Sequence, residues 1–314
     1  MILRNSIFHC TVLGGQVRCV AKDTASLEAL FLGGAGRPSF DELKDLGQFQ
    51  FEAIGDGLNI RELHPSLLRD FGDSTARCSS GAGAVAEILP THACANSLHI
   101  PSAFGFAFAQ QWAIHGHVCV HGALLRVNGE GVLVVGARAA GKSVLAGSAL
   151  AAGGQIVSDD YLLVGSHRQA LIGERIRRFV SLRRSWAADE LISQCGGDWK
   201  PDRHDRRTFL RVKDDDDRFP EYSPIDRIWL LSRPASGRQI TSSLRALSHA
   251  EMYAGLVAAI QPLLLGKDFP VERDKIRKLL VQLVARTKIA HLETGQDIVI
   301  EPERAWTRLL NYTD

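Results

Sequence analysis

Eight residues near the middle of the chain have the types and spacing that bind phosphate. Residues 136–143 read Gly-Ala-Arg-Ala-Ala-Gly-Lys-Ser, which fits the pattern Gly-x-x-x-x-Gly-Lys-Ser/Thr. Glycines let a backbone curl so that successive N–H groups point into one concavity. Lys142 can then reach the β- and γ-phosphates of a nucleotide, and the Ser143 hydroxyl can ligate Mg²⁺. The motif predicts a site for MgATP.

The flanks of this loop are those that a phosphate loop needs. An apolar run at 132–135 predicts a buried strand before it, and residues 144–152 predict a helix whose positive dipole end faces the phosphates. The alternative is a Gly/Ala-rich turn with an incidental Lys-Ser pair, and it leaves both flanks as coincidences. The predicted phosphate-binding residues are Gly136, Ala137, Arg138, Ala139, Ala140, Gly141, Lys142, Ser143 and Val144.

Two adjacent carboxylates follow downstream of the loop. Gly153-Gly154 should end the helix, a short apolar strand runs to Ser158, and Asp159-Asp160 come next. Neighbouring carboxylates repel each other, and a metal ion relieves that cost. A kinase built on a phosphate loop needs one carboxylate for Mg²⁺ and another for the attacking hydroxyl. The pair can supply both, although a solvent-facing turn would also tolerate two acids.

A histidine precedes the loop on a predicted strand. Residues 119–127 alternate partly as a strand, Asn128-Gly129 is a strong hairpin signal, and the return strand leads directly into the loop. His121 should therefore lie on the strand that pairs with the one carrying the loop. A structural role for a lone histidine stays open. Nearby His115 and His117 lack further ligands, so no metal site beyond Mg²⁺ is predicted.

These pieces together resemble the HPr kinase/phosphorylase family of bacterial serine kinases. The family pattern of His-Gly, hairpin, phosphate loop, helix and Asp-Asp strand recurs here over roughly 121–164. The resemblance implies that Asp159 is the base accepting the substrate hydroxyl proton and that Asp160 and Ser143 hold Mg²⁺. It also implies that Lys142 grips the transferring phosphate and that His121 lines the site.

The chain departs from that family pattern in two places. Arg138-Ala139 stand where the family usually has Ser-Gly, and the Cβ of Ala139 predicts a loop that avoids a positive φ at this position. The family's Glu-Arg-Gly-type signature is absent from the comparable region at 176–184. The chain is more similar to the divergent branch in which some members phosphorylate a serine of a ribosomal peptide, such as a lasso-peptide precursor.

Composition fits an ordinary globular enzyme. The 314 residues carry a net charge of +2, so no global field predicts binding to nucleic acid or membrane. No apolar run is long enough to span a bilayer, and the first ten residues lack a signal-peptide core. Six scattered cysteines without a Cys-x-x-Cys pair indicate reduced thiols. A cytoplasmic protein is expected.

The chain divides into two predicted parts. Residues 1–97 carry no catalytic motif and are expected to form a small α+β region that recognises substrate or partner. Residues 98–314 are expected to form an α/β kinase domain with a mixed central sheet, of the HPr kinase/PEP carboxykinase-like type that the resemblance implies. Its further predicted elements are a helix at 103–114, a strand at 225–232, a helix at 272–286, a strand at 288–293 and a helix from Pro302 to about Leu310.

Two charged stretches beyond the Asp pair are ambiguous. Five arginines between 175 and 184 could clamp a phosphate or an acidic peptide, or they could line the solvent side of a half-exposed strand. The acids at 214–217 predict a solvated loop, with a mobile active-site loop as the alternative.

The sequence thus predicts an ATP-dependent enzyme that transfers the γ-phosphoryl group to a serine hydroxyl of a peptide or small protein. Two alternatives remain open: a regulatory P-loop ATPase or nucleotide sensor, and a small-molecule kinase on the same scaffold. A homo-oligomer is what the resemblance implies.

Overall fold

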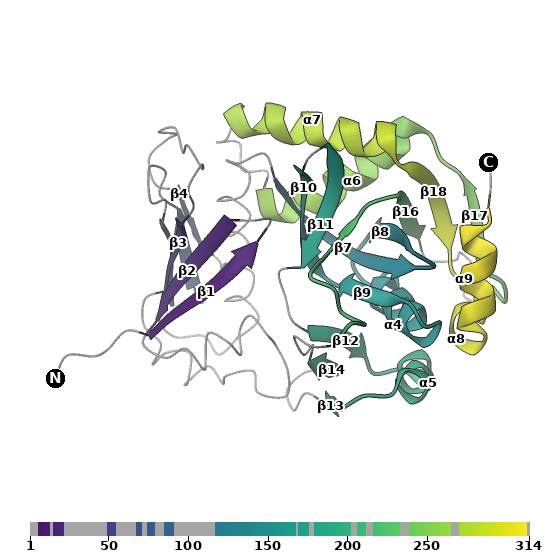
Figure 1. Ribbon diagram of the computed structural model, residues 1–314. Coiled ribbons are helices and arrows are strands. Elements are labelled where there is room, and N and C mark those ends of the chain that lie inside the picture. Colours follow the sequence, from purple (N-terminus) through teal and green to yellow (C-terminus); the bar gives the residue numbers. More distant parts are fainter. Residues whose placement is uncertain are drawn as a thin grey trace.

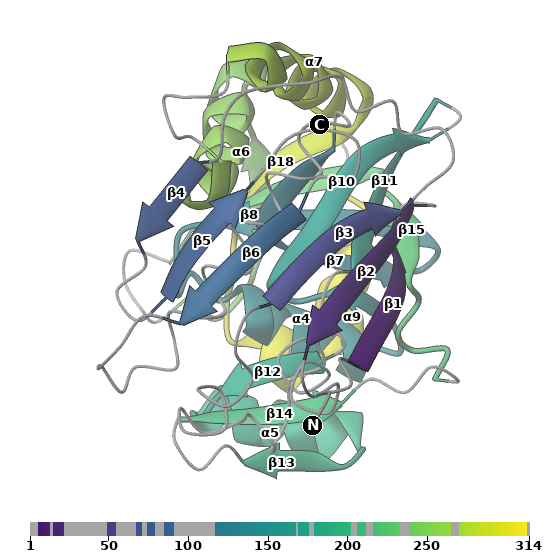
Figure 2. The same ribbon diagram turned by 90° about the vertical axis from the view of Figure 1, so that its left-hand side faces the viewer.

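The computed structural model describes residues 6–12, 15–21, 49–54, 67–70, 74–78, 85–90, 117–167, 169–175, 179–201, 206–211, 216–232, 239–264 and 270–312. The helix predicted at 103–114 lies outside these residues. The first six ranges are strands of one antiparallel sheet, ordered β1-β2-β3-β6-β5-β4, which Figure 2 shows face-on. They are β1 Ser6–Val12, β2 Gly15–Ala21, β3 Phe49–Ile54, β4 Leu67–Asp70, β5 Ser74–Cys78 and β6 Val85–Pro90.

A nine-stranded mixed sheet forms the centre of the remaining chain. Strands β8, β16 and β18 run parallel side by side, and the other neighbours pair antiparallel. The order is β15-β11-β10-β7-β8-β16-β18-β17, and β9 pairs with β7. The strands are β7 Val118–Val127, β8 Glu130–Gly136, β9 Gln155–Ser158, β10 Tyr161–His167, β11 Ala170–Arg175, β15 Tyr222–Pro224, β16 Arg227–Ser232, β17 Ser243–Ala246 and β18 Lys288–Glu293. The mixed α/β architecture agrees with the fold class that the sequence predicts.

Helices cover both faces of this sheet. Figure 1 shows α6 and α7 on one side and α4, α5, α8 and α9 on the other. The helices are α4 Lys142–Ala151, α5 Trp186–Cys195, α6 His249–Leu264, α7 Pro270–Arg286, α8 Asp297–Ile300 and α9 Pro302–Leu310. The predictions at 225–232, 272–286, 288–293 and 302–310 are confirmed. In the part of the chain that the structure describes, no helix is both long and apolar enough to cross a membrane.

A small antiparallel sheet adjoins α4. It consists of β12 Phe179–Arg183, β13 Trp199–Pro201 and β14 Arg207–Arg211, in the order β12-β14-β13. A Cβ on Gly147 of α4 would lie 3.2 Å from Leu191 of α5 and 3.4 Å from Leu182 of β12. The absence of a side chain at Gly147 therefore lets α4 pack closely against both elements.

Glycines constrain the β7–β8 hairpin in two ways, one in its turn and one where β8 closely approaches other backbone. Asn128 and Gly129 have φ of 51° and 83°, as the predicted two-residue hairpin turn requires. Gly131 donates its N–H to Asp226 Oδ2 at 2.7 Å, and a Cβ there would lie 1.8 Å from the carbonyl oxygen of Pro224. Because β8 touches backbone at this point, only glycine fits.

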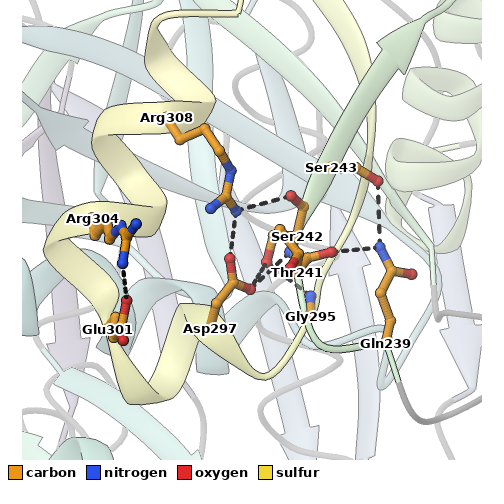
Figure 3. Close-up of polar contacts among 9 residues, drawn as sticks. All are labelled: Gln239, Thr241, Ser242, Ser243, Gly295, Asp297, Glu301, Arg304 and Arg308. Carbon is orange, nitrogen blue, oxygen red and sulfur yellow. Dashed lines mark hydrogen bonds and ion pairs between the residues drawn. The ribbon is translucent and has the colours of Figure 1, made fainter.

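Polar contacts fasten the C-terminal helices to the far end of the sheet (Figure 3). Asp297 accepts from both the N–H and the hydroxyl of Ser242 at 2.7 Å, and Arg308 bonds to the same carboxylate. Arg308 also donates to the carbonyl of Ser242 at 3.0 Å, and the Gly295 N–H donates to its hydroxyl at 2.8 Å. The network joins the segment before β17 to the segment after β18.

Candidate phosphate and carboxylate site

The loop at 136–143, for which the sequence predicts phosphate binding, connects β8 to α4 through a tight turn. Gly136 ends β8 so close to β16 that a Cβ would lie 2.4 Å from the carbonyl oxygen of Leu231. Gly141 precedes α4 with φ of 114°, a conformation that glycine adopts without strain. The two glycines of the motif are thus needed for different reasons: close approach at the first and a left-handed backbone at the second.

The backbone at Ala139 differs from the sequence prediction for this loop. Its φ is 61°, so the backbone does enter the left-handed region that the sequence predicted it would avoid. The connection between β8 and α4 imposes this conformation, and the Ala139 side chain is exposed. Ala137 and Arg138 are exposed beside it, which leaves the outer side of the loop open to a ligand.

Lys142 is folded back onto the loop. Its Nζ donates to the carbonyl oxygens of Gly136 at 2.9 Å and Ala137 at 3.1 Å, and the residue is buried. Burial lowers the pKa of Lys142, and the carboxylate of Asp160 partly offsets that shift by favouring the charged form. The first residue of α4 thus carries a cation held inside the loop with Asp160 within its electrostatic reach.

The helix behind the loop ends as predicted. The N–H of Gly153 donates to the carbonyl of Leu150 at 3.0 Å, and that of Gly154 donates to Ala149 at 2.8 Å. Gly153 has φ of 76°, so these bonds form the glycine-dependent C-terminal motif of a helix. The chain then reverses into β9 and brings the Asp pair back toward the loop.

The two adjacent aspartates face different elements. They occupy the tight turn between β9 and β10, which the Ser158 hydroxyl closes by donating to the carbonyl of Tyr161 at 2.8 Å. Asp160 Oδ1 lies 3.2 Å from Nε2 of His121, and both side chains are about a quarter exposed. Asp159 points toward the small sheet and is 3% exposed. Separation onto different partners lowers their mutual repulsion.

His121 occupies the position that the sequence expects. It is paired across the sheet with Tyr161, and the two rings lie 5.1 Å apart. The backbone N–H of Gly122 donates to the carbonyl of Asp160 at 2.8 Å. The His121–Asp160 contact therefore depends on pairing between β7 and β10.

The oxygen ligands in this region suit a small divalent cation. Magnesium prefers hard oxygen donors and keeps several waters or phosphate oxygens in its shell. Ser143 is half-buried on the first turn of α4, and Asp160 has an exposed edge. The described residues contain no group of three or more His, Cys, Asp or Glu side chains placed to hold a metal. A cation here would thus depend on nucleotide phosphates for much of its coordination.

Two residues near Asp159 were missed by the sequence analysis. The N–H of Ser181 on β12 donates to Asp159 Oδ2 at 2.7 Å, and its hydroxyl lies 3.4 Å from the same oxygen. Arg207 of β14 donates to that hydroxyl at 3.2 Å. No local motif marks either residue, because their position depends on how β12 and β14 pair.

The structure separates the arginine stretch into a buried and an exposed part, and the buried part fits neither of the two roles that the sequence left open. Arg175 is buried and donates to the carbonyl of Phe219 at 2.6 Å, so it holds the core. Arg183 and Arg184 are exposed, and Arg177 and Arg178 lie outside the described residues. Of the acidic run at 214–217, Asp216 bonds to Arg218 at 2.6 Å and orders a turn. Residues 214–215 lie outside the described part.

A separate open groove of about 1110 Å³ lies at the other end of α4. Its lining includes Ala151, the exposed Ile240 and Ile300, and also Arg304 and Arg308. None of its lining residues belongs to the phosphate loop. The ten residues of α4, about 15 Å of helix, separate it from that loop.

Comparison with known proteins finds a weak likeness among solved structures. No protein-family model matches the chain, and no curated protein matches it. Among solved structures, it is similar to the HPr(Ser) kinase/phosphatase from Coxiella burnetii, at 17% identity and a TM-score of 0.27. The match covers 41% of this chain and 72% of that one. A likeness of this size says nothing about activity.

Proposed function

We propose that the chain is an ATP-dependent kinase that transfers the γ-phosphoryl group to a serine hydroxyl of a peptide or small protein. The observation that carries the proposal is the convergence of Lys142, Asp160 and His121 at one end of β7, β8 and β10. A simple nucleotide switch needs one metal-binding carboxylate, whereas this chain has a second carboxylate, Asp159, next to Asp160.

The proposed roles follow from position and burial. The backbone N–H groups of 136–143 and Lys142 bind the phosphates and take up charge as it develops on the γ-phosphoryl group. Ser143 and Asp160 would hold Mg²⁺, which neutralises phosphate charge when bound. Asp159 accepts the serine proton, and the N–H of Ser181 holds one oxygen of its carboxylate in place.

His121 positions Asp160 in this scheme. The imidazole Nε2 lies 3.2 Å from the Asp160 carboxylate, and the imidazole ring lies tilted beside that of Tyr161, which restricts the imidazole. In-line transfer then breaks the bond between the γ-phosphorus and the bridging oxygen of ATP and forms one to the serine oxygen. ADP leaves, and the serine proton passes to Asp159.

The test is transfer of label from γ-labelled ATP to serine peptides, with Mg²⁺ titrated for the parent and for matched variants. Asp159→Asn should lose about 10²–10⁴-fold in rate with MgATP affinity kept, because it removes a base. Asp160→Asn should instead raise the Mg²⁺ concentration needed for half-maximal rate. Lys142→Ala should lose both binding and turnover.

The outcomes separate the possible activities and roles. Label released only as free phosphate, equally by the parent and Asp159→Asn, would replace the kinase with an ATPase. Near-normal transfer by Asp159→Asn with loss in Asp160→Asn at saturating Mg²⁺ would move the base to Asp160. Unchanged MgATP affinity in Lys142→Ala would overturn the phosphate loop itself.

A further inference from the structure

Four arginines gather at one end of the small sheet. Arg183 of β12 is paired directly across from Arg207 of β14, and the N–H of Arg184 donates to the carbonyl of Arg206 at 2.8 Å. Like charges opposite each other on adjacent strands destabilise a sheet. An anion bound beside Arg183 would lower this repulsion.

Three of these cations have no partner within the described part of the chain. The side chains of Arg183, Arg184 and Arg206 are exposed and form no ion pair or hydrogen bond with any described residue. Of the acids on α5, Glu190 accepts a hydrogen bond from Gln194 at 2.9 Å. Asp189 lies in the first turn of α5, where the helix dipole stabilises it.

An exposed tryptophan adjoins the arginines. Trp186 begins α5, two residues after Arg184, and 58% of its surface is exposed. The other face of the sheet is buried, because Val180 and Leu182 pack into the core. Exposed Trp together with Arg is the composition that dominates binding energy at protein interfaces. We call Arg183, Arg184, Arg206 and Trp186 the basic end.

The basic end adjoins the proposed base. Ser181, which bonds to Asp159, lies two residues before Arg183 on β12 and so on the same face of the strand. At ~3.3 Å per residue, about 7 Å of strand separates them. In-line transfer places the acceptor on the side of the γ-phosphoryl group opposite ADP. Groups beside Asp159 therefore adjoin the acceptor and not the nucleotide.

We propose that the basic end binds acidic residues that flank the acceptor serine. The inference rests on the proposed kinase function and names the chemistry of its substrate: a peptide segment with Asp or Glu close to the serine. Charge complementarity selects such a segment, and Trp186 supplies an apolar contact for it.

The test uses two pools of degenerate peptides with a central serine. One pool has Glu fixed at the two positions on each side of the serine, and the other has Lys at the same positions. The parent is compared with Arg183→Glu/Arg184→Glu and with Arg277→Glu, an exposed arginine on α7 whose side chain is 69% exposed. The parent and the control should prefer the acidic pool by about 10-fold in KM, equivalent to ~1.4 kcal/mol, and the double variant should lose that preference.

A second readout keeps the docking test independent of turnover. Fluorescein-labelled acidic peptides with alanine in place of serine are titrated and binding is followed by anisotropy, while MgATP affinity is measured separately. Weaker peptide binding in the double variant, with unchanged MgATP affinity, supports binding of acidic peptides by the basic end. If neither pool is phosphorylated in that case, only the kinase proposal fails. Equal peptide binding by the double variant and the parent overturns the inference, and so does a loss confined to MgATP.

Discussion

Ala139 offers a direct test of the phosphate loop's backbone. Its φ is 61° and its side chain is exposed. Substitutions at this position should therefore act mainly through the energetic cost of the left-handed conformation. An alanine in this region costs ~1–2 kcal/mol, and such strain reaches about 3 kcal/mol in unfavourable cases. β-Branched residues are the least suited to it.

These values give a graded series. Ala139→Gly removes the strain but increases the conformational entropy of the unfolded chain by an equivalent of ~0.5–1 kcal/mol, so stability should rise by at most ~1.5 kcal/mol. Ala139→Asn should equal or exceed alanine, because asparagine tolerates the left-handed region. Ala139→Val should lose ~1–2 kcal/mol. If phosphate binds to this same loop conformation, the strain of ~1–2 kcal/mol should also lower the MgATP affinity of Ala139→Val, by about 5–30-fold.

The assay combines urea unfolding, read as midpoints at equal m-value, with calorimetric titration of MgATP. Ala137→Val is the matched control, since Ala137 is exposed in the same loop and its φ is not positive. If valine at 139 behaves like valine at 137 in both measurements, the left-handed backbone at Ala139 is refuted. Loss of stability without loss of affinity would show that phosphate binding does not use this conformation.

Three further predictions concern packing and titration. Gly131→Ala should destabilise the protein by about 3 kcal/mol or more, because its Cβ would lie 1.8 Å from the Pro224 carbonyl oxygen. Gly129→Ala should cost only ~1 kcal/mol, because the space around it is open and the cost comes from its φ of 83° alone. Equal losses of stability in urea unfolding would contradict this prediction. Burial raises the pKa of Cys195 from its ordinary 9.0 to about 11, despite the opposing charge of Arg218. Its alkylation by iodoacetamide at about pH 8.5 should therefore be ~10²-fold slower in the folded protein than after unfolding, as measured by mass spectrometry of that residue. The same shift makes stability fall between about pH 9 and pH 11, because the unfolded chain loses this proton first.

Much of the local framework was available from the sequence. Asn128-Gly129, the glycines of the loop, Gly153 and Pro302 each restrict the backbone of their own residue or its neighbours, so they predict turns and helix ends without knowledge of the rest. The limit of such reasoning is visible at Ala139. The sequence rule disfavours a positive φ for alanine, and the connection between β8 and α4 imposes it.

The sequence by itself determined which chemical groups are present and that Lys142, Asp159 and His121 belong to one strand–loop–helix unit. Only the tertiary structure decided what each group contacts. Pairing of β7 with β10 brings His121 to Asp160, and arrival of β12 brings Ser181 to Asp159. Strand register over long separations depends on the packing of the whole core, which no local pattern records. For the same reason, Arg175 became a core residue and Arg183 a surface one.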